Sequence, residues 1–421
     1  MPAYARSGGH IDLHHDTRPP ERPQTPFKYS FSSTPLKTKK QRQHIWMDRV
    51  ISDELKNVKI MADAQSFLDF LFPNSVTFAN VKDRTSISKV FKILSQTTGR
   101  TSLYSKRKWS TKTSLCPEFG TEWTRQTEPN FAAFLNKILS TVASNLSLGK
   151  WRTWTAKYAT QHVTNTASAR KPDLLLMDGP AVPGDWRCIR VVGEMKQADS
   201  PAANTSAYKN LAEKSNFIFS AQDNRRFVLS VAFCGPTMSL ILLDRGGFIQ
   251  TTCFNIHKQP KLFLHALLAL SFADLNHIGY DATITSPGLA DVQTRQIAIH
   301  NQVSYQMRAV LFIADSIVGR GTVVWMAERK ADLDVDEDDQ MDDEIDEDEQ
   351  MGKAFDSEQV VIKDTWFDLT RKWTEGDILR HISPVKGVLR LIHEERITAK
   401  TGNLPPGPDT TDALRTLSSA I

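Results

Sequence analysis

The chain has 421 residues, a net charge of +4, an apolar content of 40% and four cysteines. This length and apolar content predict two ordinary hydrophobic cores with disordered ends, and argue against a single domain. The cysteines share no C-x-x-C spacing, so they indicate neither a zinc site nor a disulfide framework. No apolar signal segment opens the chain, and the longest apolar stretch, Leu262–Leu270, is too short to span a bilayer. We therefore expect a nuclear or cytoplasmic protein that does not use a membrane.

Positive charge is unevenly distributed along the chain. Residues 332–349 contain thirteen Asp or Glu and no Lys or Arg, which leaves 52 basic against 35 acidic residues elsewhere. A body with such an excess is suited to a polyanion, and the cluster Lys106, Arg107 and Lys108 makes nucleic acid one expected partner. The alternative is a merely soluble surface, since lysine-rich surfaces also serve solubility.

The N-terminal part divides into an arm and a helical lead-in. Residues 1–45, rich in Pro, Ser, Thr and basic groups, predict a disordered arm. Residues 46–71 have helical periodicity, which ends at Pro73. They lead into a domain that we expect to extend to residue 290.

A first long helix is predicted just before the middle of the chain. Its apolar residues recur with helical spacing, with Pro129 near the start; they are Phe131, Phe134, Leu135, Ile138, Leu139 and Val142. Glu128 lies at its beginning. It is a candidate metal ligand, and the alternative is a first-turn carboxylate favoured by the helix dipole.

Two acidic residues and a lysine follow on adjacent strand-like runs. Asp173 precedes the apolar run Leu174–Leu176, and Glu194 and Lys196 end the run that begins at Cys188. The turn residues between the runs predict a β-hairpin, which would place Asp173 near Glu194. Carboxylates bind Mg²⁺ or Mn²⁺, and a nearby ammonium can stabilise the charge of a phosphorane, so this is the layout of a PD-(D/E)xK nuclease site. The alternative is a strand-entry Pro-Asp followed by a solvated Glu-x-Lys salt bridge.

The elements after the hairpin predict an α/β fold. Residues 204–222 indicate a helix, 227–233 and 239–243 a strand pair joined by a Gly-Pro turn, and 263–276 a further helix. With the first helix they predict a restriction-endonuclease-like mixed sheet flanked by helices. A scaffold of this topology without nuclease chemistry is an equal alternative.

A third region, residues 291–395, predicts a small β-rich domain. Residues 308–317, 323–327 and 359–363 read as strands, with the turn Val318–Thr322 between the first two. The acidic run 332–349 is expected to be a solvated insertion, because thirteen like charges cannot share a packed core. Residues 396–421 predict a polar tail.

These motifs together resemble a known family. The segments KPDLLLMDG, VVGEMK, FSAQDNRRFVLSVAFCGPTMSLILLDRGG, GRGTVVW, VVIKDTW and EGDIL are similar to the fungal-type protein kinase family, over nearly the whole chain from about residue 60. The resemblance implies that residues 291–395 correspond to a kinase N-terminal lobe, and it implies ATP as cofactor.

By this resemblance Lys363 would be the phosphate-binding lysine, Glu375 its ion-pair partner, and Gly319 and Gly321 the glycines of the nucleotide loop. Val324 stands where that loop's third glycine would be. Lys363 alone would also fit an ordinary strand-end lysine. No H-R-D and no D-F-G follow, so we expect an incomplete kinase domain, either in a fragment of a longer kinase or in a shorter product.

Two functions follow from these residues. The first is a pseudokinase-like or regulatory protein that binds a nucleotide or a protein partner. The second is a metal-dependent protein that binds or cleaves nucleic acid, with Asp173, Glu194 and Lys196 as its catalytic residues and Glu128 as an additional metal ligand.

Overall fold

The computed structural model describes residues 59–79, 81, 85–96, 102–120, 122–164, 170–285, 292–299, 303–314, 317–329, 359–367, 371–399 and 407–408. The predictions made for the arm 1–45, for the acidic insertion 332–349 and for most of the tail 396–421 lie outside these ranges. None of the helices in these ranges has the length and apolar composition of a transmembrane segment.

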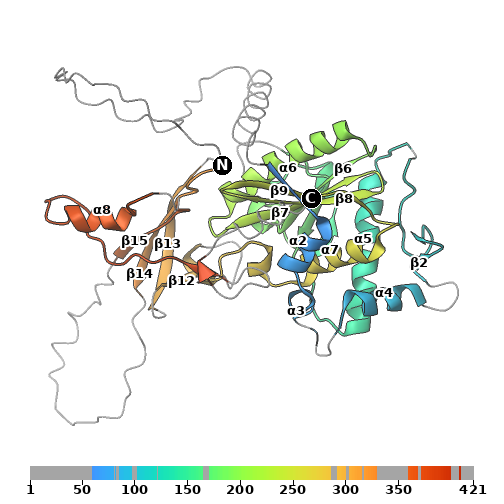
Figure 1. Ribbon diagram of the computed structural model, residues 1–421, viewed down its shortest axis with the longest axis horizontal. Coiled ribbons are helices and arrows are strands. Elements are labelled where there is room, and N and C mark those ends of the chain that lie inside the picture. The colour runs from blue at the N-terminus through green and yellow to red at the C-terminus, as the bar shows by residue number, and fades with distance from the viewer. Residues whose placement is uncertain are drawn as a thin grey trace, which may run out of the picture. The chain divides into compact units, whose positions relative to one another are not determined.

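A mixed sheet of eight strands forms the centre of the fold (Figure 1). Its order is β1-β9-β8-β7-β6-β5-β4, and β10 pairs with β8. β1 pairs with β9 and β6 pairs with β7 in parallel, whereas the other neighbours are antiparallel. The strands are β1 (Lys59–Ala62), β4 (Thr153–Thr155), β5 (Leu174–Met177), β6 (Val191–Lys196), β7 (Phe227–Cys234), β8 (Thr237–Asp244), β9 (Gly247–Thr251) and β10 (Phe254–Asn255).

Helices cover both faces of this sheet. α6 packs on one face, where Leu211 and Ile218 meet Val192 and Val228 in one apolar cluster. The other face packs in a second cluster with the remaining long helices, among them α5 and α7. β7 and β8 are accordingly apolar on both sides, as expected of strands buried between helices. The helices are α2 (Ala64–Leu71), α3 (Asn74–Thr77), α4 (Ile87–Gln96), α5 (Thr127–Leu146), α6 (Pro201–Ala221) and α7 (Pro260–Phe272).

A second sheet of five antiparallel strands follows, in the order β11-β12-β13-β14-β15. Its core contains Met307, Val323 and Trp325. After it comes the short helix α8 (Glu375–Ile382), which begins with a capping box between Thr374 and Asp377. The strands are β11 (Ile284–Thr285), β12 (Gln296–Ile299), β13 (Val303–Ile313), β14 (Val323–Arg329) and β15 (Gln359–Asp364).

Short elements complete the described chain. β2 (Tyr104–Ser105) and β3 (Lys108–Trp109) form a hairpin, and β16 (Thr398–Ala399) pairs with β17 (Gly407–Pro408) inside the predicted polar tail. Four 3₁₀ turns lie at Lys157–Ala159, Trp186–Cys188, Leu275–Ile278 and Val292–Thr294.

The predicted helices around residues 131–142, 204–222 and 263–276 are confirmed as α5, α6 and α7, and both predicted strand pairs are present. A mixed α/β fold with a large mixed sheet is therefore correct. The helix predicted for residues 46–71 is confirmed where α2 covers residues 64–71, and it is wrong for residues 59–62, which form β1 beside β9. Pairing with an exposed sheet edge outweighs a helical pattern that runs over only part of the segment.

Candidate functional site

Asp173 and Glu194 lie opposite each other on neighbouring strands. The antiparallel register pairs Leu174 with Gly193, so the next position pairs Asp173 with Glu194. A Cβ at Gly193 would lie 2.8 Å from the Cβ of Leu174, which explains a glycine at this close approach. The Asp173 carboxylate accepts a hydrogen bond from the backbone N–H of Met195 at 2.8 Å. The structure thus brings together two of the predicted site residues.

The Glu194 carboxylate is buried and surrounded by nitrogen donors. Its Oε1 accepts from Lys196 Nζ and from Asn210 Nδ2, each at 2.7 Å, and its Oε2 accepts from Lys214 Nζ. Burial alone would raise the pKa of Glu194, but the Lys214 and Lys196 ammonium groups outweigh it and hold this pKa below its usual value. Glu194 is therefore an ionised carboxylate compensated from two sides.

Asp173 has the opposite shift. Burial, and next the neighbouring Glu194 carboxylate, raise the pKa of Asp173 to about 6. Two carboxylates in one partly buried place resist being charged together, and the group with fewer cationic contacts takes up the proton first.

Lys214 is a site residue that sequence reasoning missed. It lies one turn after Asn210 on α6, and its side chain is 7% exposed. The signal was present in the sequence, because Ala207, Leu211 and Ile218 form the buried stripe of α6 and Lys214 falls into it at helical spacing. A lysine within an apolar stripe indicates a buried acidic partner, because a buried charge is stable only when it is paired.

The residues present do not fit a divalent cation well. Both Glu194 oxygens already accept from N–H donors, and the two carboxylates face two ammonium groups. In the described residues no three His, Cys, Asp or Glu side chains are grouped so that they could hold a metal ion, and Glu128 thus completes no set with Asp173 and Glu194. Mg²⁺ or Mn²⁺ at this place stays a prediction from the sequence.

A second group of predicted residues meets on the smaller sheet. Lys363 on β15 donates to both carboxylate oxygens of Glu375, at 2.5 Å each, and Glu375 is the first residue of α8. The hydrogen bond from Lys363 is the main cause that holds the pKa of Glu375 below its usual value. Both side chains are partly exposed, at 37% and 42%, so a ligand can reach them.

Contacts with other segments fix the glycine turn, residues 318–322 between β13 and β14. Gly319 and Gly321 both have positive φ, 118° and 50°. The Gly319 N–H donates to the carbonyl of Arg245 at 2.7 Å, and the Arg320 carbonyl accepts from the N–H of Trp366 at 2.8 Å. The Arg320 guanidinium also reaches Glu375 at 3.1 Å.

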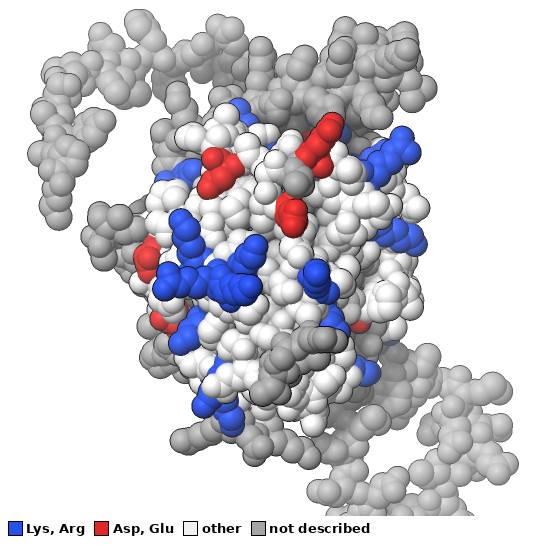
Figure 2. Space-filling model, turned by 90° about the vertical axis from the view of Figure 1, so that its right-hand side faces the viewer, with Lys and Arg blue, Asp and Glu red and all other residues white. Residues whose placement is uncertain are grey.

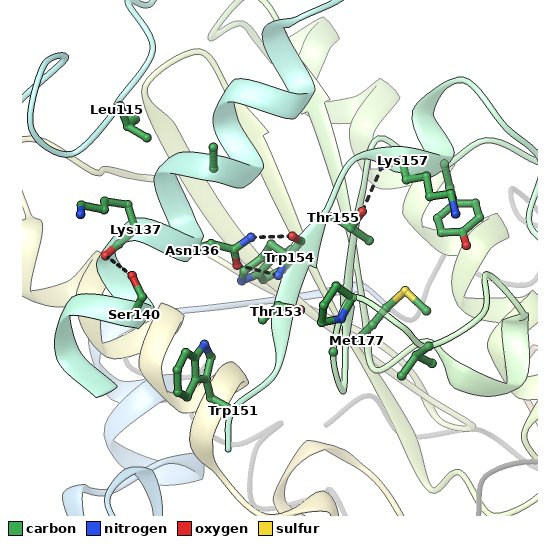
Figure 3. A pocket seen from close by; sticks show the side chains of 15 residues that line it. Leu115, Asn136, Lys137, Ser140, Trp151, Thr153, Trp154, Thr155, Lys157 and Met177 are labelled. Carbon is green, nitrogen blue, oxygen red and sulfur yellow. Dashed lines mark hydrogen bonds between the residues drawn. The ribbon is translucent and has the colours of Figure 1, made fainter. Parts of the chain in front are cut away.

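A hollow of about 640 Å³ lies elsewhere, between α5 and β4. Figure 3 shows Trp151, Thr153, Asn136 and Met177 around it. Asn136 holds the edge strand in place, because its amide exchanges two hydrogen bonds with the backbone of Trp154. None of the predicted site residues lines this hollow.

Comparison with known families gives one match. Residues 171–406, more than half of the chain, match the model of the fungal protein kinase family. The chain belongs to this family. No curated protein and no solved structure matches it.

The match with the fungal protein kinase family covers both groups of candidate site residues. It includes Asp173, Glu194 and Lys214 as well as Lys363 and Glu375. Glu128 and the basic hairpin at residues 104–109 lie before it. The nuclease-like hairpin is therefore inside the matched region of this family member.

Proposed function

We propose that this fungal protein kinase family member uses its smaller sheet to hold a nucleotide such as ATP, and that this chain acts by binding. The observation that carries the proposal is the ion pair between Lys363 and Glu375, 2.5 Å to each carboxylate oxygen. In protein kinases a strand lysine held by a helix glutamate contacts the nucleotide phosphates. Here strand and helix supply the same two residue types in the same order.

The strand pairing in the smaller sheet indicates where the base of the nucleotide would bind. Phe312 pairs with Val324, and Val324 pairs with Lys363, so these three residues form a row across β13, β14 and β15. Cross-strand partners share one face of a sheet. A base would lie against the two apolar side chains while the ammonium reaches its phosphates.

Phosphoryl transfer needs further groups. A catalytic aspartate must accept the proton of the substrate hydroxyl, and an asparagine and an aspartate must hold Mg²⁺. Neither an H-R-D nor a D-F-G triplet occurs among the 421 residues. The proposal for this chain is therefore a pseudokinase-like, regulatory role.

The exposed apolar side chains support binding to a protein partner. Among the described residues, every large apolar side chain that is more than half exposed lies between positions 311 and 392. Exposed apolar surface of this kind is typical of contact with another protein. The side chains are Leu311, Phe312, Val361, Trp373, Ile378, Val385, Leu389 and Ile392.

Titration with a fluorescent ATP analogue tests the nucleotide proposal. We expect saturable binding by the wild type and at least a tenfold weaker affinity for Lys363→Met, because the ammonium that meets the phosphates is removed. Arg308→Met is the matched control, since it breaks the pair between Arg308 and Glu328 on the same sheet. Absence of saturable binding by the wild type, or equal affinities of the three proteins, would contradict the proposal.

Nucleic-acid binding is a second candidate, and the hairpin of β2 and β3 favours it. Lys106 and Arg107 occupy its turn with positive φ, 49° and 62°, a conformation that residues with a side chain adopt at a cost. Buried Trp109 anchors the hairpin, since its Nε1 donates to the carbonyl of Ile256 at 3.0 Å. On the side where β2 lies, Lys and Arg side chains gather on the surface (Figure 2).

A salt series tests this second candidate. Replacing Lys106, Arg107 and Lys108 by alanine should weaken binding to single-stranded DNA or RNA and reduce the slope of affinity against salt, because fewer counterions are released. An unchanged slope would exclude the hairpin as the contact surface. Cleavage at Asp173, Glu194 and Lys196 would be the metal-dependent form of this function, and the nitrogen donors around Glu194 count against it.

A further inference from the structure

The polar cluster under α6 is built around one carboxylate. Glu194, whose side chain is 3% exposed, accepts from Lys196 and from Lys214, whose side chains are 25% and 7% exposed. Asn210 gives a third hydrogen bond at 2.7 Å. The cluster therefore joins the end of β6 to the middle of α6 through charged groups.

The charges in this cluster balance without any added ion. Asp173 and Glu194 supply two carboxylates, and Lys196 and Lys214 supply two ammonium groups. A divalent cation is held by a net negative set of oxygen ligands, and a buried charge is stable only when it is paired. A divalent cation that entered this cluster would be repelled by the ammonium groups of Lys196 and Lys214.

Lys214 differs from the lysine of the nuclease motif. Lys196 lies on the strand two residues after Glu194 and is the more exposed of the two. Lys214 comes from the helix that covers the sheet, and its ammonium contacts the other oxygen of Glu194. Its charge also acts on the Asp173 carboxylate, so it compensates the same two groups that a metal ion would have to bind.

We propose that the Lys214 ammonium is a built-in cation that takes the place of a divalent metal in this site. The lysine is covalently part of the chain, so the two carboxylates are compensated at all metal concentrations. The site then fixes β5, β6 and α6 to one another and holds no Mg²⁺ or Mn²⁺. Removing the ammonium should expose a pair of carboxylates and create a divalent-cation site that the wild type lacks.

The proposal is tested by removing the positive charge of Lys214 while a hydrogen-bond donor to Glu194 is kept. Lys214→Gln can still donate a hydrogen bond to Glu194 but carries no charge, and Lys209→Gln, an exposed lysine on the same helix, is the matched control. Thermal unfolding is measured with EDTA and with increasing Mn²⁺, and bound Mn²⁺ is counted by electron paramagnetic resonance.

We expect Lys214→Gln to bind one Mn²⁺ and to gain several degrees in Tm with a saturable dependence, because a ligand of the native state stabilises it. The wild type and Lys209→Gln should show neither effect. Adding Asp173→Asn to Lys214→Gln should abolish the gain.

Two results would overturn the proposal. One is Mn²⁺ bound to the wild type and lost in Asp173→Asn, since a metal would then bind with Lys214 in place. The other is a folded Lys214→Gln that responds to Mn²⁺ no more than Lys209→Gln does. The wild-type measurement decides the first point even where the Lys214 variant is poorly stable.

Discussion

Arg245 and Gly321 are in contact: a Cβ built at Gly321 would lie 2.4 Å from Nε of Arg245. Arg245 lies in the turn between β8 and β9 of the large sheet, and Gly321 in the turn between β13 and β14 of the small one. The Arg245 guanidinium also packs on the ring of Phe219, 4.2 Å from its centroid. The glycine turn is therefore shaped by a side chain of the other sheet.

Gly321→Ala should destabilise the protein by about 1–3 kcal/mol, from positive φ and from the clash with Arg245. Urea unfolding measures this. In an Arg245→Ala background the cost of Gly321→Ala should fall, because only the backbone strain remains. An equal loss of unfolding free energy in both backgrounds would show that the contact with Arg245 does not contribute to the effect of Gly321→Ala.

Asp173 gives the protein a specific pH dependence. Its folded pKa of about 6 lies above the usual 3.8, so the folded state binds the proton more tightly, and this group's contribution to stability falls as the pH rises from about 4 to 6. The Asp173→Asn variant should lack this component, while its side-chain oxygen can still accept from Met195. We therefore expect the difference in unfolding free energy between variant and wild type to shift in favour of the variant across that window. A difference that is constant with pH would contradict the raised pKa.

Asp223 ties the small sheet to the end of α6. It forms two hydrogen bonds with Arg295, at 2.6 and 2.7 Å, and accepts from Trp325 Nε1 at 2.6 Å. Asp223→Asn leaves Arg295, whose side chain is only 11% exposed, without its counter-charge, which should cost about 3 kcal/mol. The pair of Arg308 and Glu328 is the control, because its arginine is 41% exposed, and Glu328→Gln should cost less than about 1 kcal/mol. Similar losses for both variants in urea unfolding would contradict this view.

The acidic run 332–349 gives a prediction that rests on the sequence. A tethered polyanion can occupy the basic surface that nucleic acid would use. Deleting the run should tighten nucleic-acid binding and steepen its fall with salt, because more phosphate contacts form. Binding isotherms at several salt concentrations check this. Equal affinities and slopes for both forms would mean that the run is only a solvated linker.

The hairpin of β5 and β6, the helices α5, α6 and α7 and the pairing of β7 with β8 could all be predicted, because each is encoded by local hydrophobic periodicity and turn residues. The same local patterns placed Asp173 beside Glu194 and Lys363 on a strand, whereas the pairing of Lys363 with Glu375 was implied only by the resemblance to the fungal protein kinase family.

The features that could not be predicted depend on contacts between residues far apart in the sequence. Residues 59–62 became a strand only because β9, almost two hundred residues later, offers a parallel partner. Lys214 lies within the apolar stripe of α6, and only the fold places it on Glu194. The glycine turn is held by Arg245, which no spacing in the sequence connects to Gly321. Such contacts depend on which elements pack together, and local periodicity carries no information about that choice.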